Sequence, residues 1–281
     1  MKPYKGYKIM TTMKEDISRQ TIDEGKLLSR RKKRSTDSQA DFKNLNAEYC
    51  NFSNLTLENV DFENTDLTGA LFTGSSLTKV NLENVKLYCA NMDNATFNDV
   101  NMIELDVSSA SLDNVKLIGA DLNGSDFNRT SLSGADLSGC NLVNTDFTDC
   151  EICGANLSGV NAYAAQFGDT DLTDSNLDKA DFTEAYMEGS IMFLMSANDA
   201  IFAGADLSIA ALASSSLKKA NFSNANCKGA NFDRCDLTGA DFTGANLDGA
   251  YIDKKSLKHL KLSAKQLAQL ASKPLFLPYP R

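Results

Sequence analysis

A pattern of five residues repeats from Ala40 to Ile252 without an insertion or a deletion, and it constrains the fold more than any other feature. Every fifth residue from Phe42 to Ile252 is Phe, Leu, Met, Ile or Val, and the four exceptions are Ala47, Ala162, Ala197 and Cys227. The residue two places before each is always small or apolar, and neither set contains a charged residue. Because a period of five fits neither the 3.6 of a helix nor the 2 of a strand, the chain must turn a corner in every repeat, as a solenoid does.

Several repeats share one short string. ADLSG at 135–139, ANLSG at 155–159 and ADFTG at 240–244 resemble the A(D/N)LXX consensus of the pentapeptide-repeat family. The resemblance covers about three quarters of the chain. It implies an all-β fold, a right-handed quadrilateral parallel β-helix with four pentads per coil and about eleven coils, spaced about 4.8 Å apart. In such a coil the central residue of each pentad fills the interior, and the small residue two places earlier fits the tight corner.

Charge divides the chain into three segments. Residues 40–252 hold ten Lys and Arg against 31 Asp and Glu, which gives a net charge of −21, whereas 1–39 and 253–281 each carry +6. We therefore expect an acidic pentapeptide-repeat β-helix at 40–252. A basic N-terminal arm, partly helical or disordered, precedes it at 1–39, and a C-terminal helix with a Pro-rich tail follows at 253–281.

The basic arm contains one concentrated run of charge, formed by Arg30, Arg31, Lys32, Lys33 and Arg34. Two interpretations stay open: a solvated linker, or a nuclear-import or anionic-surface signal. Capping-box spacing at Thr12 with Glu15 and at Thr21 with Glu24 also predicts one or two short helices. Such a helix would cover the open hydrophobic end of the rod.

The C-terminal segment predicts a helix over 264–271 with Ser263 as its N-cap, ended by the prolines that follow. This helix either caps the last coil or pairs with its twin in another subunit. Resemblance to the gyrase-protecting members of the family implies a homodimer through the C-terminal end. The tail, with Phe276 and Tyr279, would then lie along the outer wall as an extended or polyproline segment.

Two candidate surfaces follow from the register, because residues twenty apart stack on one wall. The acidic stripe is a line of carboxylates with Lys86 after the first: Asp66, Asp106, Asp126 and Asp146. The apolar candidate surface lies where the consensus weakens: Tyr186, Ile191, Phe193, Leu194, Ile201 and Ile209. Exposed apolar patches usually mark contact sites. The alternative is that the C-terminal tail or the N-terminal helix covers these residues.

The sequence lacks the convergent reactive groups that catalysis needs. His259 is the single histidine and lies beyond the repeats. Cys150 and Cys153 have CxxC spacing, but the register points the first inward and the second outward, so the two thiols should diverge. No Gly-rich phosphate loop or calcium-binding spacing occurs. We therefore expect no enzyme activity, no cofactor and no metal.

These features indicate a non-enzymatic protein-binding scaffold, a rigid acidic rod that docks a protein partner. Two narrower functions stay open. One is a DNA mimic that binds a type II topoisomerase, which the resemblance implies. The other is a secreted bacterial effector whose N-terminal arm serves translocation or host targeting, with a host protein as partner. We expect no direct nucleic acid binding by the rod and no membrane span. The cysteine pattern and the lack of a signal-peptide core predict a cytoplasmic protein, or secretion into a host cell without a cleaved signal.

Overall fold

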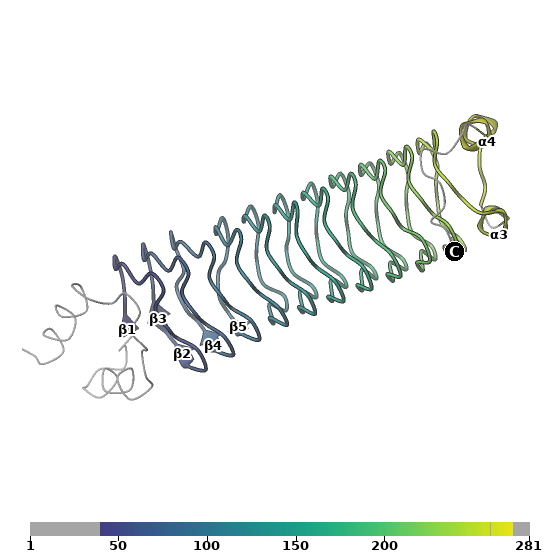
Figure 1. The fold of residues 1–281 in the computed structure, drawn as a ribbon. Coiled ribbons are helices and arrows are strands. Elements are labelled where there is room, and N and C mark those ends of the chain that lie inside the picture. The colour runs from purple at the N-terminus through teal and green to yellow at the C-terminus, as the bar shows by residue number, and fades with distance from the viewer. Residues whose placement is uncertain (1–39, 259, 272–281) are drawn as a thin grey trace, which may run out of the picture.

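The computed structural model describes residues 40–258 and 260–271, and the chain winds there into one elongated stack of coils (Figure 1). Parallel β-bridges join residues twenty apart, from the pair Asn46 and Asp66 to the pair Asn231 and Tyr251. Four pentads therefore complete one coil. The fold is the four-sided parallel β-helix that the sequence predicted.

Among the described residues, strands longer than a single bridge occur in the first coils. β1 (Ala40–Asp41) pairs with β3 (Val60–Asp61). β2 (Thr56–Glu58), β4 (Ser76–Thr78) and β5 (Thr96–Asn98) form a parallel sheet in that order. In later coils each side is joined to the next coil by a single β-bridge, which the residue before the central one forms. The strand is no longer than this because the chain turns two residues after the bridge.

Most corners are four-residue turns closed by a backbone hydrogen bond. In one pentad the N–H of Ala70 donates to the carbonyl of Leu67 over 2.9 Å, and Gly69 between them has a φ of +65°. Positive φ at the third turn residue is typical of type II turns, and Gly, Asn and Asp adopt it at the least cost. This is why these three residue types occupy most corners of the rod.

The interior is filled as the sequence predicted, because every central side chain from Phe42 to Ile252 is buried. Phenylalanines on one side stack from coil to coil. The ring centroids of Phe182 and Phe202 are 5.4 Å apart, those of Phe202 and Phe222 5.0 Å, and those of Phe222 and Phe242 4.7 Å. These distances are close to the coil spacing of about 4.8 Å, so the rings are in contact along the axis.

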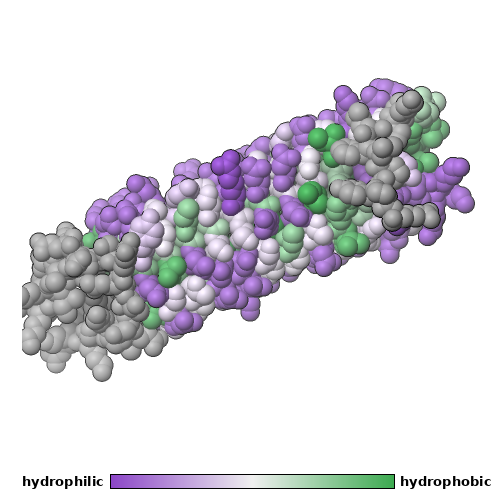
Figure 2. All heavy atoms as spheres, in the orientation of Figure 1, coloured by the Kyte–Doolittle hydropathy of each residue, from purple (hydrophilic) through white to green (hydrophobic). Residues whose placement is uncertain are grey.

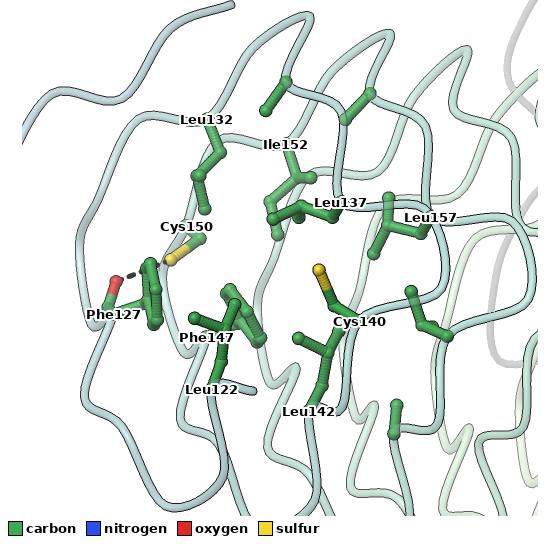
Figure 3. Close-up of a cluster of buried hydrophobic side chains, with 14 of the residues drawn as sticks. Leu122, Phe127, Leu132, Leu137, Cys140, Leu142, Phe147, Cys150, Ile152 and Leu157 are labelled. Atoms are coloured by element: carbon green, nitrogen blue, oxygen red, sulfur yellow. Dashed lines mark hydrogen bonds between the residues drawn. The ribbon is translucent and has the colours of Figure 1, made fainter. Parts of the chain in front are cut away.

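Small polar side chains at the inward corner positions tie neighbouring coils together. Thr145 Oγ1 donates to the carbonyl of Leu122 over 2.8 Å. Cys150 Sγ points into the interior and donates to the carbonyl of Phe127 over 2.8 Å (Figure 3). Each donor reaches a carbonyl 23 residues earlier, in the preceding coil. Buried hydroxyls are therefore paired, and no described side chain has a buried N or O atom without a hydrogen-bond partner.

Two short helices follow the last coil: α3 (Lys254–Leu257) and α4 (Ala264–Leu270). Ser263 is the N-cap of α4, as the sequence predicted, and it forms a capping box with Gln266. The separate α3 was not predicted.

Side-chain amides of α4 bind the end of the rod. Gln266 is buried, and its Nε2 donates to the carbonyl of Phe242 over 2.6 Å and to that of Ala245 over 3.2 Å. Gln269 Nε2 donates to Asn246 Oδ1 over 2.9 Å. The described part of the C-terminal segment therefore caps the last coil, where the next coil would otherwise supply donors.

The N-cap of α3 predicts a pH dependence. The Asp253 carboxylate accepts backbone N–H groups of Lys255 at 2.8 Å, Ser256 at 3.2 Å and Arg234 at 2.9 Å. Burial alone would raise the pKa of Asp253, but these bonds and the Ser256 hydroxyl outweigh it and hold the pKa below its ordinary value of 3.8. The ionised Asp253 carboxylate therefore stabilises the folded chain. This stabilisation is complete at pH values above 3.8, the pKa in the unfolded chain, and is lost as the pH falls through the lower pKa of the folded chain.

We expect Asp253→Ala to lower the free energy of unfolding by about 1 kcal/mol near neutral pH, the usual effect of losing an N-cap. The difference between wild type and variant should shrink as the pH falls below the ordinary pKa of 3.8. Urea unfolding at a series of pH values measures it. If wild type and Asp253→Ala differ in unfolding free energy by the same amount down to the lowest pH, the charge of the Asp253 carboxylate does not stabilise the fold.

Candidate functional site: the outer walls of the rod

The acidic stripe is one continuous column of the wall. β-bridges pair Asp66 with Lys86, Lys86 with Asp106, Asp106 with Asp126, and Asp126 with Asp146. Successive members of the column are therefore about one coil spacing, ~4.8 Å, apart. The stacking that the register predicted is confirmed by these bridges.

Asp66 differs from the other three aspartates of the stripe. Lys86 Nζ lies 3.6 Å from Asp66 Oδ2. Burial alone would raise the pKa of Asp66, but the hydrogen bonds from Thr68 and the charge of Lys86 outweigh it and lower the pKa. Within 40–258 and 260–271, no Lys or Arg forms an ion pair with the other three. The stripe therefore contains a run of three carboxylates that no described cation neutralises.

Backbone hydrogen bonds hold these three carboxylates in place. In each, Oδ1 accepts the N–H of the residue two places later, over 3.0 Å at Asp106, 2.9 Å at Asp126 and 2.8 Å at Asp146. This is the Asx-turn arrangement, in which an aspartate bonds its own following backbone. The charges are thus fixed in line before any ligand arrives, which lowers the ordering cost of binding.

The apolar candidate surface does not lie on one wall. Tyr186 belongs to the column of the acidic stripe, between Gln166 and Asp206. Ile191 is one pentad further along and Ile201 three pentads further, so Ile191 and Ile201 stand on opposite sides of a four-sided coil. The expectation of a single surface that includes Ile201 is therefore wrong.

Tyr186 also acts as a polar residue. Its hydroxyl donates to Glu188 Oε2 over 2.5 Å, and this hydrogen bond raises the pKa of Tyr186 to about 12. The ring is exposed, but it lies beside carboxylates.

The remaining apolar residues gather on one side of the rod and at the two corners that flank it. Ile191, Phe193 and the corner residue Leu194 share a pentad, and Ile209 occupies the corner that leads to the same side one coil later. Ala211 pairs with Ile191 in that next coil. We call the set Ile191, Phe193, Leu194, Ile209, Ala211 and Ala213 the apolar strip. Sequence analysis missed the two alanines, which are conspicuous only as replacements for the usual polar residues.

Figure 2 shows that the visible wall is mainly hydrophilic, with hydrophobic side chains more frequent toward the C-terminal end of the rod. Leu194 is 60% exposed and Ile209 38%. Both adopt left-handed backbone angles, with φ of 58° and 52°. This conformation costs an L-residue about 1–2 kcal/mol, and a β-branched isoleucine is an outlier there.

The spacing of twenty residues per coil agrees with a match to a known family of repeats. The model of the pentapeptide repeats matches residues 38–74, 65–102, 75–114, 110–149, 155–192 and 215–252, more than half of the chain. The chain belongs to the pentapeptide-repeat family. Proteins of this family fold as right-handed quadrilateral β-helices, in agreement with the register of twenty. The comparison with curated proteins gave no match.

Solved pentapeptide-repeat structures resemble the chain. HetL, involved in heterocyst differentiation regulation in the cyanobacterium Nostoc sp. strain PCC 7120, is 24% identical with a TM-score of 0.37, over 82% of this chain and 96% of HetL. QnrB1, a plasmid-mediated fluoroquinolone resistance protein, is 15% identical with a TM-score of 0.37, over 84% and 97%. A thylakoid-lumen protein of Arabidopsis thaliana is 30% identical with a TM-score of 0.24, over 36% and 66%.

The CxxC cysteines of this pentapeptide-repeat rod diverge as predicted. Cys150 is buried in the interior, whereas Cys153 is partly exposed on the wall, with its Sγ 4.0 Å from the carbonyl oxygen of Asp171. Burial raises the pKa of Cys150 to about 12 and that of Cys153 to about 11, so neither is an activated thiolate near neutral pH.

The described part of the chain holds no group of three or more His, Cys, Asp and Glu placed to bind a metal ion. None of its helices is long and apolar enough to cross a membrane. His259 and the basic run Arg30–Arg34 lie outside the described residues.

Proposed function

We propose that this chain is a non-enzymatic protein-binding scaffold whose acidic stripe is the surface on which a protein partner docks. The observation that carries the proposal is the run Asp106, Asp126 and Asp146, which is fixed by backbone hydrogen bonds and has no described counter-ion. Stacked like charges destabilise a fold, and a partner with complementary Lys or Arg residues relieves that repulsion. Such complementarity also steers association and fixes register.

A matched pair of variants tests this proposal. The stripe variant changes Asp106, Asp126 and Asp146 to Asn, which removes three charges while an amide oxygen still accepts the Asx-turn hydrogen bond. The control changes Asp121, Asp181 and Asp241 to Asn. These three share a different column and make the same turn, over 3.2, 2.9 and 2.8 Å.

We expect pull-down with wild type and with the control to capture the same proteins, and the stripe variant to capture them at least tenfold less. Capture should also weaken as the salt concentration rises, because exposed charges are screened. Equal capture by all three proteins would overturn the proposal.

A DNA mimic that binds a type II topoisomerase is a narrower candidate. The net charge of −21 over 40–252 and the evenly spaced carboxylates favour it, because a DNA-binding cleft recognises closely spaced negative charge. A DNA supercoiling assay with purified gyrase tests it. We expect micromolar wild-type protein to inhibit gyrase or protect it from a fluoroquinolone, with the stripe variant at least tenfold weaker. No effect of the wild type would contradict this candidate.

Several sequence-based expectations stay predictions. They are a bacterial effector role that relies on the basic arm at 1–39, a host protein as partner, a homodimer through the C-terminal end, and a cytoplasmic location.

A further inference from the structure

Near the C-terminal end, several outward positions are buried. Gly229 and Gly249 occupy corners, and Asn231 precedes a central residue, yet all three are buried, with Asn231 only 7% exposed. Corner glycines in the middle of the rod, such as Gly139 and Gly159, are exposed. The wall around Gly229 is therefore a covered surface.

This covered wall continues directly into the apolar strip. Gly249, Gly229 and Ile209 are twenty residues apart and stack in one corner column. In the adjacent column Asn231 pairs with Ala211, and Ala211 with Ile191. Small side chains thus line the wall from Gly249 to Ala211, and this line ends at the bulky apolar side chains of Ile209 and Ile191.

Helix α4 brings the chain to the start of this path. Gln269 Nε2 donates to Asn246 Oδ1 over 2.9 Å, Asn246 Nδ2 to Asn226 Oδ1 over 3.1 Å, and Asn226 Nδ2 to Asp206 Oδ1 over 3.0 Å. This ladder fixes the end of α4 above the column beside the Gly249 corner. Ala271, two residues after Gln269, therefore lies next to the covered wall.

The ten residues that follow have the composition and length to reach the strip. Their sequence is SKPLFLPYPR. At about 3.1 Å per residue, the rise of a polyproline helix, Phe276 would lie about 16 Å beyond Ala271. The last coil and the coil of Ile191 are three coils apart, about 14 Å at one strand spacing per coil.

Ile209 adds an independent argument. Its φ of 52° is strained for isoleucine, and the corners one coil before and after it are Gly189 and Gly229. A β-branched residue in such a conformation is maintained only where the surroundings compensate for it. A contact made by the Ile209 side chain would supply that compensation.

We propose that the C-terminal segment 272–281 of this chain docks in cis along the wall from Gly249 to Ile191, with Leu275 and Phe276 against the apolar strip. Docked in this way, the segment lies over the apolar strip. The proposal goes beyond the protein-binding function, since it concerns a side of the rod adjacent to that of the acidic stripe.

Cross-linking of the full chain tests the proposal. With Cys89→Ser and Cys153→Ser removing the accessible thiols, Ile191→Cys is combined with Phe276→Cys and treated with a short bismaleimide. The matched control pairs Phe276→Cys with Ile118→Cys, since Ile118 is a 61% exposed isoleucine several coils away. We expect an intramolecular cross-link at least tenfold more abundant in the first pair. Equal yields would overturn the proposal, and so would a product that joins two chains, which would make a second copy the occupant.

A further variant separates docking from folding. Ile209→Asn introduces a residue that tolerates the left-handed corner, so the rod should keep or raise its thermal midpoint. We expect the cross-link between positions 191 and 276 to fall at least threefold. An unchanged yield would contradict the proposed contact. The stripe variant should leave this cross-link unchanged, so failure of the protein-binding proposal and failure of the docking proposal are distinguishable.

Discussion

Replacing Phe222 with alanine is expected to lower the free energy of unfolding by about 3–5 kcal/mol, the usual effect of removing a buried aromatic ring. Phe222 is fully buried, and its ring centroid lies 5.0 Å from that of Phe202 and 4.7 Å from that of Phe242. Both neighbouring coils are held by backbone hydrogen bonds, so the cavity cannot collapse. Urea unfolding followed by far-ultraviolet circular dichroism measures the loss, because the chain contains no tryptophan.

Ser223→Ala is the control for this experiment. The residue follows Phe222 in the chain but lies partly exposed on the wall, and surface substitutions usually change stability by less than about 0.5 kcal/mol. A loss below about 1 kcal/mol for Phe222→Ala would contradict the tightly packed interior.

Replacing Gln266 with methionine is expected to destabilise the C-terminal end by about 2–4 kcal/mol. The substitution keeps the side-chain length but removes the donor to the carbonyls of Phe242 and Ala245. Each buried group that loses its partner costs about 1–3 kcal/mol. Hydrogen exchange of the peptide 240–252 measures the effect. At 1.36 kcal/mol per tenfold change, we expect exchange about thirty to a thousand times faster.

Two comparisons make this result specific. Lys265→Met changes an exposed neighbour on the same helix and should leave exchange unchanged. The middle coils should also be unaffected in Gln266→Met, because each coil of a solenoid contacts only its neighbours. Equal exchange at 240–252 in wild type and Gln266→Met would show that this amide does not hold the cap.

The acidic stripe could be read from the sequence because its members are twenty residues apart in an uninterrupted repeat. Ile201 lies outside the wall on which the sequence prediction placed it. Ile191 and Ile201 are close in sequence, but ten residues are two sides of the coil, so they lie on opposite walls. Closeness along a solenoid chain does not mean closeness on its surface.

The C-terminal cap could be predicted only in part. Ser263 precedes a strong helix-forming run, and this local signal correctly placed the N-cap of α4. Asp253, three residues before Ser256, is a similar local signal for α3. The bonds from Gln266 to the rod have no sequence signal, because they join segments that no repeat relates.

The sequence by itself determined which side chains face inward and which stack together along each wall. A period of five that never slips leaves one solution for both, because any other arrangement would bury charge. The tertiary structure alone decided how the rod ends and which outward positions become buried. The contacts at the rod end depend on how α3 and α4 pack against the last coil, and helices of four and seven residues carry no periodic constraint that fixes their positions.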